Sequence, residues 1–348
     1  MSNLPSHIVF LTPGFAEDMA DATSVTALQD YLKLIRQNLP NTKLTLLSFQ
    51  FPFSNQCYNW NGIDVIPLNG RNSKLRKIFI WYKAWIALRK INRENPISII
   101  HSFWIGECSY VGQFFSNSKN IKHIVTAMGQ DVFKNKYARL LNPSKSKVVT
   151  LSKNHSDLLL KNYGLKSEII PWSIPLEDFP EIKENMLDIL GVGSLNSVKN
   201  YAVFINVIEA VAKKHPNLKV AIIGEGKALQ SIEKEINKQG LNAVITLCGK
   251  RSRTDVFEKM SAAKILLHTS KYESFGYVFA EALYSGMKVV SFDVGASSAI
   301  PEWKIGATID SLIEACLSFL NTTESTKYRV LLNAQTETLH SYIKIYNE

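Results

Sequence analysis

The clearest indication of the fold lies in one stretch, KILLHTSKYESFGYVFAEALYSGMKVVSF, which runs from Lys264 to Phe292. It opens with the apolar run Lys264–His268, crosses a polar loop, enters a helix near Gly276, and closes with a second apolar run, Lys288–Phe292. Two short apolar runs joined by one helix are typical of a βαβ unit, whose strands are parallel. The stretch therefore predicts a parallel α/β sheet.

The same alternation of apolar runs and helix-period segments fills the rest of the chain. A first helix is expected from Val25 to Leu39, because apolar residues recur there at three- and four-residue spacing and Pro40 follows. Further strands are expected at His7–Leu11, Leu44–Phe49, Ile97–Ser102, Ile124–Ala127, Val148–Ser152, Glu168–Ile170, Leu187–Val192, Lys219–Ile223 and Val244–Cys248. The chain is therefore predicted to be an α/β protein with doubly wound, Rossmann-like parallel sheets.

The length of 348 residues predicts two domains, because a single core seldom extends over so long a chain. The segment SIPLEDFPEIKENM, Ser173–Met186, holds two prolines and several acidic residues without an apolar rhythm, which is typical of a connection. We therefore expect a first domain over 1–172, a linker over 173–186 and a second domain over 187–330. The chain reads as helix from about Ser325, and residues 331–348 form the closing helix.

Charge and cysteine content narrow the class of protein. The formal net charge of +10, with a pI near 9.2, predicts an anionic partner: nucleic acid, a phosphorylated small molecule or an acidic membrane surface. The alternative is that the charge only maintains solubility. The four cysteines match neither zinc-site nor disulfide spacing, which favours a reducing cytoplasm. No apolar window approaches the roughly 20 residues of a membrane span, so a soluble or peripheral protein is expected.

Loops that follow strands are the expected ligand sites, because open α/β sheets bind ligands beyond the carboxyl ends of their strands. Three such loops of the second domain carry glycines: GVGSLNSVKN (Gly191–Asn200), IIGEG (Ile222–Gly226) and CGKRSR (Cys248–Arg253). The first and third also carry the cations Lys199 and Arg251. This edge of the second domain is therefore the predicted binding edge.

A fourth loop holds Glu273, and Glu281 follows eight residues later in the helix that starts near Gly276. The free N–H groups at a helix start attract phosphate, and Lys199 or Arg251 would add positive charge. Glu281 would accept hydrogen bonds from a vicinal diol such as a ribose, and Glu273 from hydroxyls at the other end of the ligand. The alternative is that both acids are ordinary helix-start charges favoured by the helix dipole.

The segment ESFGYVFAE, Glu273–Glu281, resembles the E-x7-E motif of the retaining nucleotide-sugar glycosyltransferases of family 4, which have the GT-B fold. GVGSLNSVKN is similar to the glycine-and-lysine loop of that family, and IIPWSIPLEDF to the end of its first domain. The resemblance covers nearly the whole chain, with weaker matches at IVFLTPGFAED, TAMGQDV and LHSYIKIYNE. It implies two domains that face a central cleft, with the acceptor bound by the first, the donor by the second, and the closing helix crossing back to the first.

The resemblance also implies roles for individual residues. Glu281 would bind the ribose, while Glu273 and Lys199 would be the catalytic residues at the donor sugar and the diphosphate. Gly14 would let a first-domain loop approach the phosphates. The full expected donor set is Gly14, Gly193, Ser194, Lys199, Arg251, Glu273, Ser274, Phe275, Gly276, Tyr277 and Glu281. Neither a metal ion nor a cofactor is implied, since cations and the helix start would hold the diphosphate. The products would keep the anomeric configuration of the donor.

Two departures from the family pattern affect the expected site. Ser194 stands where the family usually has an arginine, so one of the neighbouring cations Lys250, Arg251 and Arg253 would have to replace it. Met128 stands in place of the histidine of the HGxD-like segment. The residues expected on the acceptor side are His101, Trp104, Met128 and Asp131. For His101, which lies near a strand end, a structural role is the alternative.

A basic segment from Arg71 to Arg93 holds eight lysines and arginines without an acidic residue. Aromatic residues are interleaved with the cations. The helical spacing of Ile78, Tyr82, Trp85, Leu88 and Ile91 predicts that this face packs on the core. The segment is typical of a helix that binds an anionic membrane surface, and a solvated helix face is the alternative. Nucleic acid is not an expected partner, because no recognised binding motif is present.

These observations together predict a metal-independent hexosyltransferase that is cytoplasmic and peripheral at the inner membrane face. It would move a sugar from a UDP- or GDP-sugar to a glycan or lipid-linked acceptor in the synthesis of a cell-surface polysaccharide or glycolipid. Two alternatives remain open: a nucleotide-sugar epimerase of the same fold, and a non-catalytic nucleotide-sugar-binding protein. A dinucleotide oxidoreductase is disfavoured, because GVGSLN lacks the third glycine of its fingerprint.

Overall fold

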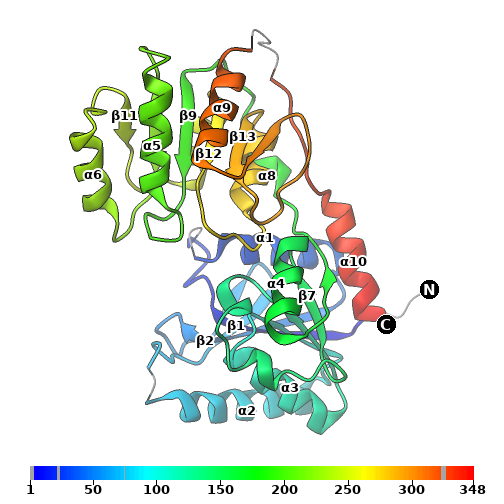
Figure 1. Cartoon of the computed structure of the whole chain (residues 1–348). Coiled ribbons are helices and arrows are strands. Elements are labelled where there is room, and N and C mark those ends of the chain that lie inside the picture. Colours follow the sequence, from blue (N-terminus) through cyan, green and yellow to red (C-terminus); the bar gives the residue numbers. More distant parts are fainter. Residues whose placement is uncertain (1–3, 22–23, 74, 323–326) are drawn as a thin grey trace. The chain divides into compact units, whose positions relative to one another are not determined.

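The computed structural model describes residues 4–21, 24–73, 75–322 and 327–348. Its contacts divide the chain into two compact units (Figure 1). The first unit comprises Met1–Ser173 together with Ala334–Glu348, and the second comprises Ile174–Asn333. Lys74 of the basic segment and residues 323–326, where the closing helix was expected to begin, lie outside the described residues.

The first unit contains an eight-stranded sheet in the order β3-β4-β2-β1-β5-β6-β7-β8. Its strands are β1 (His7–Gly14), β2 (Lys43–Phe51), β3 (Tyr58–Trp60), β4 (Ile63–Pro67), β5 (Ile99–Phe103), β6 (Lys122–Thr126), β7 (Lys147–Thr150) and β8 (Glu168–Ile169). Its α-helices are α1 (Thr26–Asn38), α2 (Lys77–Glu94), α3 (Glu107–Lys119), α4 (Lys153–Tyr163) and α10 (Gln335–Asn347). Two 3-10 helices are formed by Gln130–Val132 and Ala138–Leu140. Neighbouring strands are parallel except β3 and β4, which pair antiparallel at one edge.

The second unit contains a six-stranded, parallel sheet in the order β11-β10-β9-β12-β13-β14. Its strands are β9 (Leu187–Val192), β10 (Val220–Ile223), β11 (Ile245–Leu247), β12 (Ala263–His268), β13 (Lys288–Phe292) and β14 (Trp303–Gly306). Its α-helices are α5 (Tyr201–Ala212), α6 (Leu229–Lys238), α7 (Arg253–Ser261), α8 (Tyr277–Tyr284) and α9 (Ile309–Leu320), and Leu176–Asp178 form a 3-10 helix.

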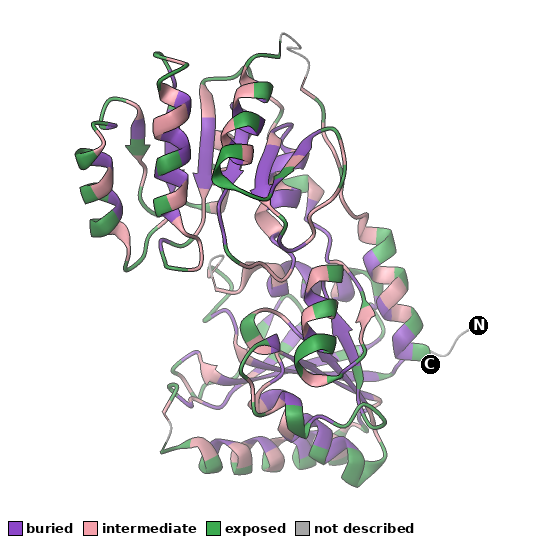
Figure 2. Cartoon of the chain, in the orientation of Figure 1, coloured by how far each residue is buried: buried purple, intermediate pink, exposed green. Residues whose placement is uncertain are grey.

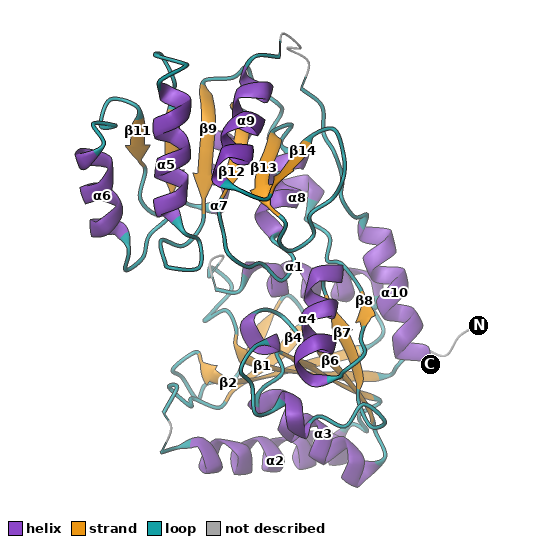
Figure 3. Cartoon of the chain, viewed as in Figure 1, coloured by secondary structure: helices purple, strands orange, loops and turns teal. Residues whose placement is uncertain are grey.

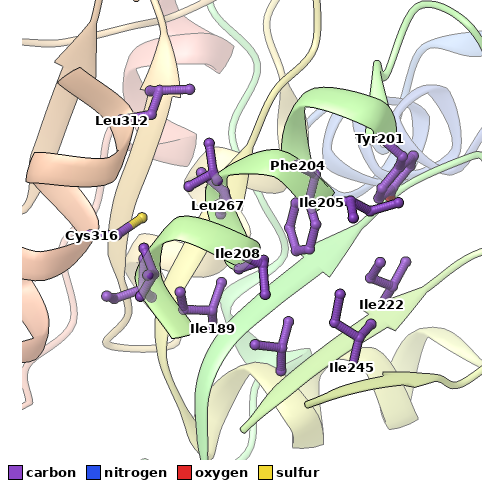
Figure 4. Packing of buried hydrophobic residues seen from close by; sticks show 14 of the residues in the cluster. Ile189, Tyr201, Phe204, Ile205, Ile208, Ile222, Ile245, Leu267, Leu312 and Cys316 are labelled. Carbon is purple, nitrogen blue, oxygen red and sulfur yellow. The ribbon is translucent and has the colours of Figure 1, made fainter. Parts of the chain in front are cut away.

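Alternate residues of the strands supply the cores on the two faces of each sheet. Figure 2 shows that the strands are largely buried. In β9, Ile189 packs in a cluster with α5, α6 and α9 (Figure 4), while the next residue, Leu190, packs in a cluster with α7 and α8. Both faces of the strands are thus buried, which explains why they read as continuous apolar runs. The helix layers on both faces of each sheet are visible in Figure 3. The predicted parallel α/β fold class is confirmed.

The structure corrects several element boundaries. β3, β4 and β14 were not predicted, and the β3–β4 pair adds an antiparallel edge to a sheet that was expected to be parallel throughout. Residues 327–334 are not helical, so the closing helix begins only at Gln335. α10 then packs within the first unit, where the Trp172 indole N–H donates to the Tyr342 hydroxyl over 2.9 Å.

The buried face of α2 is only partly the one predicted from its apolar spacing: Leu88 and Ile91 are buried and Trp85 is half-buried, as expected. Ile80, Ala84, Leu88 and Ile91 face the core of the first unit. Ile78 and Tyr82, which were expected to be buried, are instead 80% and 62% exposed. Apolar residues occur on every side of this helix, so its spacing is compatible with more than one buried face.

Candidate functional site

The strand order of the second unit brings two of the predicted loops together. β9 and β12 are parallel neighbours, so the loops that follow them leave the same edge of the sheet side by side. The Lys271 N–H donates to the Val198 carbonyl over 2.8 Å, and the Thr269 hydroxyl donates to the Lys199 carbonyl over 3.1 Å. These bonds fix the backbone of Lys199 against the loop that carries Glu273.

Glu273 and Lys199 form an ion pair, and the ring Nε2 of His268 lies 2.8 Å from the same carboxylate oxygen. Burial raises the pKa of Glu273, but the bond from His268 and the charge of Lys199 outweigh it, and the pKa falls to about 2. Burial lowers the pKa of His268, although Glu273 acts in the opposite direction. A neutral His268 beside an ionised Glu273 must carry its proton on Nε2 and donate it. The ionised Glu273 is then a pure hydrogen-bond acceptor, suited to hydroxyl groups.

Glu281, in α8, pairs with Arg253, whose guanidinium nitrogen lies 3.2 Å from a carboxylate oxygen. Arg253 is the first residue of α7, and its guanidinium lies 5.1 Å from the ring centre of Phe257. Both side chains of the pair are mostly buried. Arg251, the predicted phosphate-binding cation, is exposed on the loop before α7. Of the three cations that were expected to replace the arginine missing at Ser194, the structure thus places Arg253 beside Glu281.

The start of α8 is shaped by Gly276, which has a φ of 78° in the left-handed region. A Cβ atom at this position would lie 2.4 Å from the ring of Phe279. The preceding residue is fixed as well, since the Ala296 N–H donates to the Phe275 carbonyl over 2.8 Å. Phe275 and Gly276 are buried, while Ser274 and Tyr277 are half-buried. A helix start of this kind presents backbone N–H groups to an anion.

The glycine loops after β9 and β10 approach each other closely. The Gly193 N–H donates to the Ile223 carbonyl over 3.0 Å, and Gly224 has a φ of 155°. A Cβ atom on Gly224 would lie 1.9 Å from the Gly193 carbonyl oxygen, so a side chain has no room there. Ser194, in the same loop, is exposed. The glycine signal in the sequence thus reflects backbone packing at this edge.

Two residues of the first unit that were predicted to contact a ligand, His101 and Gly14, lie in strands of the sheet. His101 is completely buried in β5, where Nδ1 lies 2.9 Å from the Tyr346 hydroxyl and Nε2 lies 2.8 Å from the Thr126 hydroxyl. Burial holds the pKa of His101 well below its usual value. The expectation that His101 faces a ligand is therefore wrong, and its role is structural. Gly14 ends β1 and pairs with Phe51 of β2.

The other three acceptor-side residues come together after β5 and β6. The carboxylate of Asp131 accepts from the N–H groups of Ile105 and Gly129, each over 2.7 Å, and from that of Met128 over 3.3 Å. Burial raises the pKa of Asp131, and these bonds act in the opposite direction. Trp104 has a φ of 63°, an uncommon backbone conformation for a bulky residue. Asp131 therefore ties the two loops to each other.

A pocket of about 360 Å³ lies at the carboxyl ends of β1 and β2 in the first unit, and the sequence did not reveal it. Its walls include Pro13, Gln50, Lys77, Glu107 and Tyr137. The Glu107 carboxylate is held by Lys77 at 2.6 Å, by the Trp81 indole N–H at 3.1 Å and by the Gln50 amide at 3.3 Å. A fixed carboxylate with amide and aromatic neighbours is a suitable setting for a hydroxylated ligand.

His268 is the residue at the second-unit site that the sequence did not single out, and Arg253 was named only as one of three cations that could replace the missing arginine. His268 ends an apolar strand at its carboxyl end, and a polar residue in that position is a usable signal. Arg253 belongs to a cluster of three cations, from Lys250 to Arg253, and nothing in the sequence distinguishes it from the others. Among the described residues, the structure shows no cluster of histidine, cysteine or acidic side chains suited to hold a metal ion.

Residues 176–316 match the model of the protein family called glycosyl transferases group 1. The chain is 26% identical to an uncharacterised glycosyltransferase of Methanocaldococcus jannaschii, over 65% of this chain and 65% of that protein. It is 31% identical to the poly(glycerol-phosphate) alpha-glucosyltransferase of Bacillus subtilis, over 34% of this chain and 18% of that protein. The matches thus span less than two thirds of the lengths of these relatives.

Solved structures resemble the chain over nearly its whole length. The sucrose-phosphate synthase of Thermosynechococcus elongatus has a TM-score of 0.71 at 15% identity, covering 98% of this chain and 96% of that one. The Anabaena protein HepE, in complex with UDP and glucose, has a TM-score of 0.69 at 13% identity, covering 98% and 95%. These similarities establish the fold. Residues 176–316, most of the second unit, thus match the glycosyl transferases group 1, and the chain has the GT-B fold.

Proposed function

We propose that the chain is a glycosyltransferase that takes a hexose from a nucleotide-diphosphate sugar, a UDP- or GDP-sugar, and transfers it to a hydroxylated acceptor. The observation that carries the proposal is the cluster at the start of α8: Glu273 held by Lys199 and His268, and Glu281 held by Arg253. The name of the Bacillus subtilis relative supports it, since it describes transfer of glucose. HepE, which shares the fold, binds UDP and glucose.

Each member of the cluster has a role in this proposal. The ionised Glu273 accepts hydrogen bonds from the hydroxyls of the donor sugar, and Glu281 accepts them from the ribose. Lys199 and the N–H groups at the start of α8 bind the diphosphate, together with Arg253, which supplies the charge that Ser194 lacks. Stabilising the charge that develops on the departing phosphate is the main catalytic effect. The sugar keeps its anomeric configuration.

The donor site is tested by thermal unfolding with a panel of UDP-, GDP-, ADP- and TDP-sugars. A donor at about a hundred times its dissociation constant stabilises the fold by about 2.7 kcal/mol, which is readily measured. We expect one nucleotide class to raise the melting temperature of the wild type, and expect the effect to be lost in Glu281→Gln. Glu314→Gln, an exposed position of α9, is the matched control and keeps the effect. No shift with any nucleotide sugar would overturn the donor-site assignment.

Turnover of the donor identified in this way separates the three candidate activities. A transferase releases the nucleotide diphosphate and forms a glycosylated product when an acceptor is present. An epimerase converts the donor sugar without an acceptor. A binding protein shows the thermal shift without either reaction.

For the acceptor, we infer that its hydroxylated part binds in the pocket around Glu107 in the first unit. Gln50, Glu107 and Tyr137 provide hydrogen-bonding groups and an aromatic ring, the usual elements of a saccharide site. A glycan or lipid-linked acceptor of a cell-surface polysaccharide or glycolipid fits this inference. None of the helices in the described part of the chain has the length and apolar character needed to cross a bilayer.

A further inference from the structure

The outward side of α2 exposes a row of large apolar side chains. Leu75, just before the helix, is 97% exposed, and Ile78, Phe79, Tyr82 and Ile86 are 80%, 56%, 62% and 45% exposed. They recur at intervals of three and four residues, so they form one stripe along the helix. Contiguous apolar patches of this kind are rare on soluble proteins and mark a surface that contacts another body.

Cations continue the same side of α2 toward its end. Arg89, Lys90 and Arg93 are exposed, and with Lys119 of α3 they line a shallow groove of about 470 Å³. Over residues 71–93 the sequence has eight lysines and arginines and no acidic residue. Lys77 differs from the exposed cations, because it faces Glu107 in the pocket at the other side of the helix. Among the exposed cations, Lys90 lies 4.0 Å from the exposed carboxylate of Glu94 at the end of α2. The exposed stripe and these three α2 cations are called the α2 outer surface below; Figure 2 shows the exposed residues along this helix.

We propose that the α2 outer surface docks the chain on an anionic lipid bilayer. The apolar stripe enters the boundary between head groups and acyl chains, and Arg89, Lys90 and Arg93 pair with anionic head groups. The groove that these three cations line together with Lys119 has room for a phosphate group. Charge complementarity favours an anionic bilayer over a protein partner. A protein would have to present apolar groups opposite the stripe and acidic groups opposite the cations, in the same order along α2. A soluble polyanion would use the cations but leave the apolar stripe in water.

The loop before β3 lies beside α2, since the Lys83 ammonium donates to the Asn55 side-chain carbonyl over 3.3 Å. Phe53 is 51% exposed, and the guanidinium of Arg71 lies 6.0 Å from its ring centre. An aromatic ring beside a cation is again suited to the interface between head groups and acyl chains. Docking does not depend on the proposed transfer reaction, although it would bring a lipid-linked acceptor near the pocket that Lys77 of the same helix lines.

The test is flotation of the full chain, without any nucleotide sugar, with phosphatidylcholine vesicles that contain or lack phosphatidylglycerol. We expect binding to the anionic vesicles and little binding to pure phosphatidylcholine. Replacing Arg89, Lys90 and Arg93 by glutamine is expected to weaken binding about a hundredfold, at about 1 kcal/mol for each cation near the surface. Leu75→Ser with Ile78→Ser is expected to weaken it at least tenfold, since a buried apolar side chain contributes about 1.5 kcal/mol or more.

Matched controls use exposed positions elsewhere. Replacing Lys214, Lys219 and Lys234 by glutamine removes the same charge from the second unit, and Leu160→Ser with Met186→Ser removes two exposed apolar groups. Both controls are expected to bind like the wild type. The proposal is overturned if the controls weaken binding as much as the α2 variants do, or if the chain does not bind anionic vesicles. Unchanged vesicle binding by the Leu75 and Ile78 variant, with equal affinity for soluble polyphosphate, would assign the surface to a soluble polyanion instead.

Discussion

At the scale of single residues, the most informative contact is the hydrogen bond from His268 to Glu273. Its acceptor is an ionised carboxylate with a pKa near 2, and both groups are buried. A hydrogen bond to a charged group of this kind contributes about 2 kcal/mol. His268 does not contact the donor in the proposed reaction, so it acts by positioning Glu273.

We predict that His268→Ala lowers kcat/KM for the donor about 30-fold, which corresponds to the loss of about 2 kcal/mol. His268→Gln should recover most of the activity, because its amide can donate to the same carboxylate. Without the hydrogen bond from His268, the pKa of Glu273 rises toward its ordinary range. The activity of His268→Ala should therefore begin to fall at a higher pH than that of the wild type when the pH is lowered. If kcat/KM falls equally in both variants and its decrease at acid pH is unchanged, then His268 contributes only by filling space.

The sequence identified Lys199, Glu273 and Glu281, because the E-x7-E segment and the lysine loop are recognisable as motifs. It did not single out His268, which lowers the pKa of Glu273, and it could not choose Arg253 from the three cations of its loop. Arg253 lies 28 residues before Glu281, and the two meet only because α7 packs against α8. The prediction for His101 was wrong for a similar reason. Its place near a strand end suggested an exposed position, but α10 covers it, with Tyr346 lying 245 residues further along the chain.

At the scale of elements, the start of α8 depends on the glycine at position 276. Gly276→Ala places a methyl group in the left-handed region and against the ring of Phe279, 2.4 Å away. The backbone strain alone costs about 1 kcal/mol, and the overlap adds to it. The helix start that would bind the donor phosphates must then shift.

We predict that Gly276→Ala lowers the free energy of unfolding by about 2 kcal/mol or more and abolishes the thermal shift with nucleotide sugars. Gly240→Ala is the matched control: its φ is +69°, but nothing lies within 4 Å of the added methyl group. Gly240→Ala should cost only about 1 kcal/mol and keep the thermal shift. Urea unfolding gives both free energies. Equal values for the two variants would mean that the contact with Phe279 is relieved without cost.

The existence of helix α2 could be predicted from the sequence, but its buried face could not. Its existence follows from composition. Nine of the ten positions from Ile78 to Ala87 are apolar, so apolar residues lie on every side and periodicity cannot choose the buried face. The face is chosen by packing against the sheet and α3, which the sequence does not show.

At the scale of the whole molecule, the parallel α/β architecture was predictable because strands buried on both faces read as apolar runs. The strands β3, β4 and β14 are short and carry polar residues, such as Asp64 in β4 and Lys304 in β14. They are strands because a neighbouring strand pairs with them, and this pairing is not encoded in their own composition.

The two units also differ in their buried histidines, and this difference predicts a pH response. Burial lowers the pKa of His7 and His101 in the first unit, and it lowers that of His123 to about 3 and that of His155 to about 4. In the second unit His268 is affected in the same direction. A histidine whose pKa is lowered by folding binds its proton only after unfolding. Its contribution to stability is therefore complete above its ordinary pKa of about 6.5 and decreases as the pH falls below that value.

Each such histidine reduces the free energy of unfolding by up to about 1.4 kcal/mol for each pH unit below about 6.5. Four act on the first unit and one on the second, so the first unit should lose stability faster between about pH 6.5 and pH 5. Glu273, whose pKa is also lowered by folding, stabilises the fold fully above its ordinary value of 4.5 and loses this contribution only as the pH falls below 4.5, outside this window. Hydrogen exchange of peptides from each unit measures the two stabilities separately. Replacing the exposed His340 by asparagine should leave the pH response unchanged, whereas equal losses in both units would contradict the burial of the four first-unit histidines as its cause.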